Sequence, residues 1–135
     1  MTVKNDLKKY KALYYEVKFL KKEIEDMYNT VKAVNYDEKT GKGGGDDLTL
    51  MIVTQILKRK NDFEKKLKRL YEEEAAILEQ LGSIENAEIK RVMILRYIDF
   101  QPWEKIAKQT NYTERRVLQL HHEGLMILES QKKGA

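Results

Sequence analysis

The chain has 135 residues, of which 36% are charged and 41% are apolar, and its formal net charge is +4. This composition fits one domain, or one domain with an appendage, with a modest core, and its many Lys, Glu and Leu residues are typical of long helices. The absence of cysteine excludes disulfides and thiolate metal sites and agrees with a reducing compartment.

The sequence gives no indication of a membrane segment. It contains no run of about 18 apolar residues, and its start lacks the apolar stretch of a signal peptide. We therefore expect a cytoplasmic protein with no membrane partner. Residues 83–135 hold nine Lys or Arg against seven Asp or Glu, the same excess as in the rest of the chain. Charge alone therefore does not indicate DNA binding.

Residues 4–35 carry an apolar repeat of seven residues, which predicts a long helix ending near Tyr36. The a and d positions of four consecutive heptads are apolar: Tyr10, Leu13, Val17, Leu20, Ile24, Met27, Val31 and Val34. A lone helix would leave this stripe in water, so it requires a partner. Tyr14 and Tyr28 widen the stripe and favour packing in a bundle.

The segment DEKTGKGGGDD, residues 37–47, interrupts the helical pattern with four glycines. It lacks the spacing of a phosphate-binding loop, and no strand precedes it. We interpret it as a flexible connector that lets the next helix fold back antiparallel. Asp46 or Asp47 is expected to cap that helix.

The second long helix is expected to reach Leu81. Ile56, Phe63, Leu70 and Ile77 recur every seven residues, but Lys60 and Glu74 interrupt the seam. Seven of the residues from 58 to 69 are basic and two are acidic. This run suits a DNA backbone or an acidic protein, although such runs are more often a solvated helix face.

Gly82 and Ser83 mark a helix stop and the cap of a third helix, which is expected to end near Ile98. Ile89, Val92 and Met93 give this helix an apolar face. We place a domain boundary here, with a helical hairpin for oligomerisation or docking in residues 1–82 and a DNA-binding domain in residues 83–135. The polar ending after Leu128 is expected to fray.

Residues 101–125 predict a short helix, a tight turn and a second helix. Pro102 suits the first helical position, Asn111 tolerates the left-handed backbone of the turn, and Thr113 is a good N-cap. Val117, Leu120 and Leu125 mark the buried side of the second helix. This is the design of a helix-turn-helix, which offers the N-terminal half of its second helix to the major groove.

The second helix carries side chains that suit base recognition. Arg bonds bidentately to guanine, Gln to adenine, and Glu accepts from cytosine. The candidate DNA-binding residues are Thr113, Glu114, Arg115, Arg116, Gln119 and His122. The alternatives are a helical hairpin whose polar face meets water, and a protein-docking module.

Residues 94–128 resemble region 4 of bacterial sigma factors. They are especially similar to the sigma-like small regulators, of RinA/ArpU type, from phages of low-GC Gram-positive bacteria. The shared pattern is met by Leu95, Arg96, Tyr97, Trp103, Ile106, Ala107, Thr113, Val117, His121 and Leu125. Two departures, Thr110 in place of an apolar residue and Gly124 in place of a small helix former, are expected to weaken the unit slightly.

The resemblance implies that this unit recognises a promoter element and contacts RNA polymerase, with Glu114, Arg115 and Gln119 at reading positions. Trp103 is expected to pack on the preceding helix near Leu95 or Tyr97. No catalytic constellation is present, and His121 and His122 point about 100° apart on a helix, so they cannot share a metal. We expect no enzyme activity, cofactor or metal.

The expected fold is all-α, with a long antiparallel coiled-coil-like hairpin followed by a sigma region 4-like helix-turn-helix. The expected function is sequence-specific binding of double-stranded DNA by a phage transcription activator, as a homodimer joined through residues 4–81. One alternative is a DNA-packaging protein of small-terminase type, although those proteins generally carry the DNA-binding unit first. The other is a helical docking adaptor.

Overall fold

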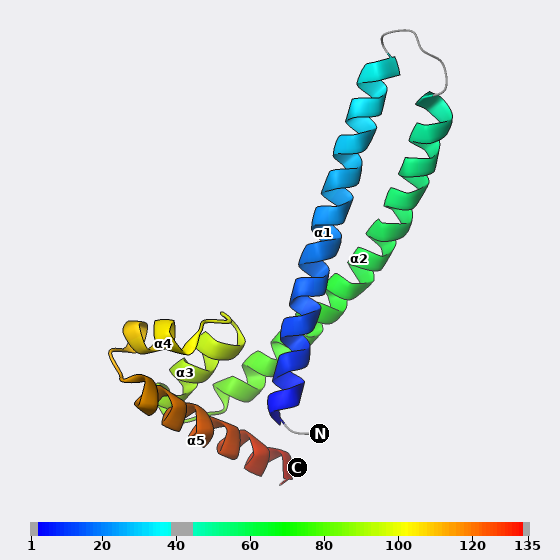
Figure 1. Cartoon of the computed structure of the whole chain (residues 1–135). Helices are drawn as coiled ribbons and strands as arrows, with labels where there is room; N and C mark the ends of the chain where they lie inside the picture. The colour runs from blue at the N-terminus through cyan, green and yellow to red at the C-terminus, as the bar shows by residue number, and fades with distance from the viewer. Residues whose placement is uncertain (1–2, 39–44, 134–135) are drawn as a thin grey trace. The chain divides into compact units, whose positions relative to one another are not determined.

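A computed structural model describes residues 3–38 and 45–133, which form five α-helices with no strand among them (Figure 1). The helices are α1 (Val3–Glu38), α2 (Gly45–Gly82), α3 (Ala87–Tyr97), α4 (Trp103–Thr110) and α5 (Glu114–Lys133). The all-α class is confirmed. None of the described helices is both long enough and apolar enough to cross a membrane.

Contacts divide the chain into two compact units. One unit comprises Leu13–Leu70, and the other, which we call the C-terminal unit, comprises Met1–Ala12 together with Tyr71–Ala135. The C-terminal helices therefore share a unit with the start of α1 and the end of α2. The functional boundary that the sequence suggests at residue 82 stays a prediction.

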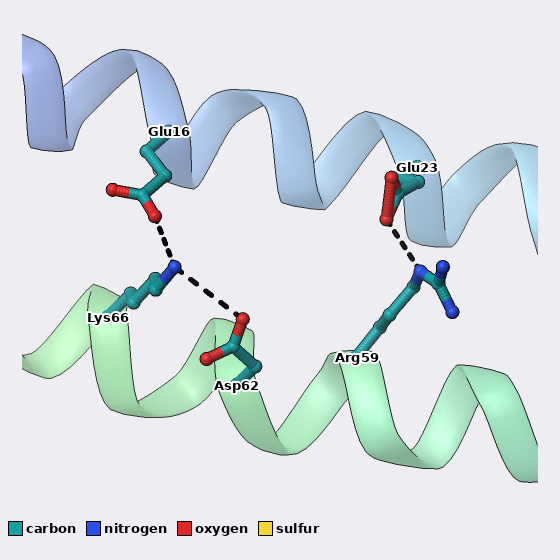
Figure 2. A network of polar contacts seen from close by, with 5 residues as sticks. All are labelled: Glu16, Glu23, Arg59, Asp62 and Lys66. Atoms are coloured by element: carbon teal, nitrogen blue, oxygen red, sulfur yellow. Dashed lines mark hydrogen bonds and ion pairs between the residues drawn. The ribbon is translucent and has the colours of Figure 1, made fainter.

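In the Leu13–Leu70 unit, the heptad positions face inward. Leu13, Val17, Ile24, Ile56 and Leu70 are buried, and Leu20, Met27 and Val31 of α1 are half-buried. Two ion pairs join the helices in opposite sequence order, Glu16 with Lys66 and Glu23 with Arg59, so the two helices run antiparallel within this unit (Figure 2).

The ends of the long helices differ slightly from expectation. Helix α1 continues to Glu38 instead of ending near Tyr36, and α2 begins at Gly45. Asp46 and Asp47 therefore lie within the first turn of α2 and not at its N-cap. The connector itself lies largely outside the described residues.

The cap of α3 is Asn86 and not Ser83. The Asn86 Oδ1 atom accepts a hydrogen bond from the Ile89 N–H at 3.0 Å, as an N-cap does. The Ser83 hydroxyl instead donates to the Gln80 carbonyl at 2.6 Å, so it serves the end of α2. The helix begins three residues later than the sequence predicted, so the residue that precedes its first turn is Asn86.

The turn between α4 and α5 has the conformation that the sequence predicts. Asn111 adopts φ 62° and ψ 24°, in the left-handed region, and the Thr113 Oγ1 atom accepts from the Arg116 N–H at 3.1 Å. Pro102 is one position earlier than expected, because it is the N-cap and Trp103 is the first helical residue. Thr110 is buried, but its hydroxyl donates to the Ile106 carbonyl at 2.7 Å, which satisfies it.

The start of α1 and the end of α5 are tied together within the C-terminal unit. Lys132 Nζ lies 2.9 Å from Asp6 Oδ2, and the Val3 N–H donates to Glu129 Oε1 at 2.5 Å. These contacts explain why α5 stays helical to Lys133, whereas the polar sequence after Leu128 predicted fraying. That expectation is wrong because it omitted the partner helix.

Gly124 has a packing role that corrects its interpretation as a weakening departure. A Cβ atom at this position would lie 2.7 Å from Met93 Sδ and 3.1 Å from Ile89 Cγ2, so α3 and α5 approach closely only because Gly124 has no side chain. Met93 has no exposed surface and little room to move. Leu125, expected on the buried side, is half-buried, and Leu128 completes the inner face instead.

We expect Gly124→Ala to lower the free energy of unfolding, although Ala is the better helix former. Overpacking costs about 1–3 kcal/mol, whereas the gain in helix propensity is about 1 kcal/mol. Gly82→Ala is the matched control, since nothing lies within 4 Å of a Cβ placed there. Urea unfolding of both variants gives the measurement, and a Gly124→Ala protein as stable as its control would contradict the packing role.

Candidate nucleic-acid interface

The N-terminal half of α5 carries the predicted DNA-binding side chains on its exposed surface. Thr113, Glu114, Arg115, Arg116, Gln119 and His122 are all exposed. Val117 and Leu120, between them in sequence, are buried against the rest of the C-terminal unit. The 3.6-residue helical period thus separates a supporting face from an outer face.

Four of the six predicted residues line one shallow groove, which we call the α5 groove. It is lined by Glu114, Arg115, Leu118, Gln119, His122 and Glu123. These positions form two rows of residues four apart, so side chains in each row are neighbours on the helix surface. A ligand in the groove would meet both rows at once.

Thr113 and Arg116 lie outside this groove. Thr113 acts as the helix cap, while the Arg116 Nη2 atom lies 3.9 Å from Glu88 Oε2 of α3 and its Nη1 atom lies 3.5 Å from Gln119 Oε1. Both ends of the Arg116–Glu88 pair are substantially exposed, so it contributes little to stability. Arg116 can therefore exchange Glu88 for another anion at small cost.

The sequence analysis did not identify two residues of the α5 groove, or Tyr112 in the turn before α5. Leu118 is 46% exposed although it is apolar, and Glu123 lies one turn beyond Gln119. The spacing of 114, 118 and 122 and of 115, 119 and 123 would have identified both. Tyr112 lies in the turn before α5, and a side-chain hydrogen bond with Glu88 of α3 raises the pKa of its phenol.

The charges in the α5 groove limit how it can bind. Arg115 is its only cation when His122 is neutral, and Glu114 and Glu123 are both acidic. Attraction to phosphates is therefore weak in this groove, and binding there depends on hydrogen bonds and apolar contact. Leu118 suits contact with a thymine methyl group, which is apolar readout in the major groove.

A buried aromatic cluster supports the middle of α5. His121 Nε2 lies 2.5 Å from the Tyr97 hydroxyl, and the rings of His121 and Trp103 meet edge to face at 4.7 Å. The Arg96 guanidinium lies over the Trp103 ring, 4.0 Å from the ring centre. Trp103 is half-buried and packs on α3 as expected, but through Arg96, and it also contacts α5.

Burial lowers the pKa of His121 to about 4, with the positive charges of Lys4, Arg96 and His122 acting in the same direction. Burial also raises the pKa of Tyr97. His121 is therefore neutral at physiological pH, and its Nε2 atom accepts from the Tyr97 hydroxyl. This contact joins α5 to α3 directly behind the α5 groove.

The basic run of α2 is partly neutralised within its own unit. Arg59 Nε lies 2.6 Å from Glu23 Oε1, and Lys66 pairs with both Glu16 and Asp62 (Figure 2). These contacts place two of the seven basic residues in the seam between α1 and α2. They favour the interpretation of the run as part of helix pairing and not as one continuous DNA-binding face.

Comparisons with known proteins do not identify a family. No protein-family model matches the chain, and searches of curated proteins and of solved structures returned no significant match.

The described residues contain no group of three or more His, Cys, Asp or Glu side chains arranged to hold a metal ion.

The lowered pKa of His121 predicts that acidification destabilises the fold. Between about pH 6.5 and pH 4 the unfolded chain takes up a proton that folded His121 does not, so the free energy of unfolding falls as the pH drops, by at most about 1.4 kcal/mol per pH unit. His121→Gln should flatten this slope, because its side chain has no proton to gain. His122→Gln keeps the Tyr97 contact and the burial of His121 and removes only the smallest of the charges that lower its pKa, so it serves as the control.

Urea unfolding at several pH values measures the difference between the variants. Carboxylates also titrate at low pH, so the comparison with the parent isolates the contribution of His121. Equal slopes for His121→Gln and the parent would show that His121 is protonated freely in the folded protein.

Proposed function

We propose that the chain is a sequence-specific binding protein for double-stranded DNA, in which α4, the turn at Asn111 and α5 act as a helix-turn-helix. The observation that carries this proposal is that Glu114, Arg115, Gln119 and His122 share the α5 groove, on the exposed N-terminal half of a rigidly supported helix. A helix with such an exposed face fits the major groove of DNA, which is wide enough to admit an α-helix.

Each side chain has a definite role in this proposal. Arg115 donates to guanine, Gln119 bonds to adenine, and Glu114 or Glu123 accepts from a cytosine amino group. Arg116 leaves Glu88 for a backbone phosphate, and the Thr113 N-cap fixes the start of the helix. His122 and Leu118 lie in the same groove and complete the contact surface. The protein acts by binding alone, without a cofactor.

The sigma region 4 resemblance of residues 94–128 narrows the proposal to transcription. On that basis the chain is a phage activator in the cytoplasm that recognises a promoter element and assists host RNA polymerase. The expected contacts of Glu114, Arg115 and Gln119 with bases correspond to the reading positions that the resemblance implies.

Arg115→Ala and Gln119→Ala should each weaken binding to the preferred site by about 1–3 kcal/mol and relax discrimination at one base position. The preferred site is obtained by selecting bound sequences from random duplex DNA. Gln80→Ala, an exposed change on α2, is the control and should bind as the parent does. If both α5 variants keep the parent's affinity and preference, the groove does not read bases.

We also propose that the chain forms a homodimer through α1 and α2. Both helices expose large apolar side chains that their pairing leaves uncovered: Tyr15, Phe19 and Tyr28 on α1, and Leu48, Leu50, Met51, Val53, Leu57, Tyr71 and Leu78 on α2. Covering such side chains removes apolar surface from water, at roughly 25 cal/mol per Å². A twofold dimer would carry two reading helices and favour an inverted-repeat site.

Light scattering across a dilution series tests the dimer. Leu57 is 62% exposed, so Leu57→Lys should shift the parent's dimer towards monomer without disturbing the fold. Gln80→Lys adds the same charge at another exposed position and should not. A parent mass near 16.0 kDa at every concentration would contradict the dimer. A ring-shaped oligomer would favour the packaging function instead.

Docking to a protein is the second candidate function, and one observation favours it. Beyond the α5 groove, a second groove along α5 is lined by His122, Leu125, Met126, Glu129, Ser130 and Lys133, and Met126 is 59% exposed. Leu125 and Met126, together with Leu118, give α5 an apolar strip suited to a partner helix. Failure to bind any duplex DNA at low salt would favour this function.

A further inference from the structure

A pocket in the C-terminal unit concentrates positive charge away from the α5 groove. It has a volume of about 180 Å³, and we call it the basic pocket, lined by Lys4, Leu7, Lys8, Lys11, Arg96, Tyr97, Phe100 and Trp103. The three lysines are spaced four and three residues apart, so they share one face of α1. The lining contains four cations and no carboxylate.

The aromatic residues of the basic pocket hold cations in place. Arg96 lies 4.0 Å from the Trp103 ring centre, and its Nη1 atom donates to the Gln101 carbonyl at 3.0 Å. Lys11 Nζ lies 5.7 Å from the Phe100 ring centre. Such cation–π contacts fix the position of a charge without neutralising it. The rings therefore position the cations and are not free platforms for stacking a ligand.

The backbone at the pocket is held in an uncommon conformation. Phe100 has φ 55°, in the left-handed region that a bulky side chain rarely adopts. Its ring lies 5.8 Å from that of Tyr10 and beneath Lys11, so the strained residue places an aromatic wall against α1. Such a conformation costs free energy and persists only where the surrounding structure holds the residue in place. Residues of this kind cluster at active sites and ligand sites.

Within the described residues, no ion pair compensates the positive charge of the pocket. None of Lys4, Lys8, Lys11 and Arg96 forms an ion pair with any residue in the described part of the chain, whereas Lys132 and Lys66 do. Lys4 and Arg96 also contribute to the lowered pKa of His121, which records their positive field in the protein interior. Clustered like charges beside apolar walls attract an anion.

We propose that the basic pocket binds a phosphate group, whose anionic oxygens accept charge-assisted hydrogen bonds from Lys and Arg. The volume suits a phosphate with a small substituent. Two sources share this chemistry, namely a free phosphate or phosphomonoester and the phosphate of a nucleic-acid backbone. The proposal rests on the pocket alone and does not depend on base reading by the α5 groove.

Trp103 is the only tryptophan and lines the pocket, so its fluorescence reports binding directly. Inorganic phosphate is titrated into the full chain at pH 8, with sodium chloride adjusted to keep the ionic strength constant. We expect a saturable change in the parent. Lys4→Gln/Lys8→Gln should raise the apparent Kd at least about tenfold, as expected for the loss of charge-assisted hydrogen bonds.

The control is Lys21→Gln/Lys22→Gln, which removes the same charge from two exposed positions of α1 outside the pocket. It should keep the parent's Kd within about twofold, since exposed charges further apart than a Debye length are largely screened. A response that does not saturate, or equal weakening in both double variants, would show general attraction to a basic protein and overturn the proposal. Because Lys4 and Lys8 are exposed, folding should survive, and Lys8→Gln alone is the fallback variant.

Binding to random duplex DNA then identifies the source of the phosphate. If the backbone supplies it, Lys4→Gln/Lys8→Gln should lower the salt dependence of DNA binding by about one to two phosphates, equally for all sequences. If a free phosphate supplies it, saturable phosphate binding remains and the salt dependence equals that of the control. Arg115→Ala should leave phosphate binding unchanged in both cases, so failure of the pocket and failure of base reading are distinguishable.

Discussion

The close approach of α3 and α5 at Gly124 is the constraint on which the C-terminal unit depends. Met93 and Ile89 occupy the space where a side chain at residue 124 would lie. Because this contact sets the distance between the two helices, Tyr97 of α3 comes within hydrogen-bonding distance of His121 on α5. The same helix then presents the α5 groove on its outer side. Packing behind the groove therefore determines how rigidly its side chains are held.

The two candidate binding surfaces use different physical chemistry. The α5 groove has nearly balanced charge and offers hydrogen-bonding groups with one exposed leucine, which suits recognition of a patterned surface. The basic pocket has four cations and no acidic lining, which suits attraction of an anion with little selectivity beyond charge. In a DNA complex, contacts of the first kind specify sequence and contacts of the second kind supply affinity. The net charge of the chain reveals neither surface, because it averages over both.

The seam between α1 and α2 shows why an abundance of charge does not identify a function. The basic run of α2 resembles a nucleic-acid or acidic-partner surface when it is read alone. In the structure, Arg59 and Lys66 turn towards carboxylates of α1, and their charges align two antiparallel helices (Figure 2). The apolar side chains that remain exposed on these helices are the more informative feature, since large exposed apolar patches mark interaction sites.

The sequence by itself determined the all-α class, the approximate helix bounds, the Asn111 turn, the Thr113 cap and the buried Val117 and Leu120. These depend on local backbone preferences and on the helical period, which are written in adjacent residues. Only the tertiary structure decided that Gly124 is required by Met93 and that Lys4, Lys8 and Lys11 meet Arg96 in one pocket. Those features join residues far apart in the chain, and no local pattern specifies which distant surfaces will come into contact.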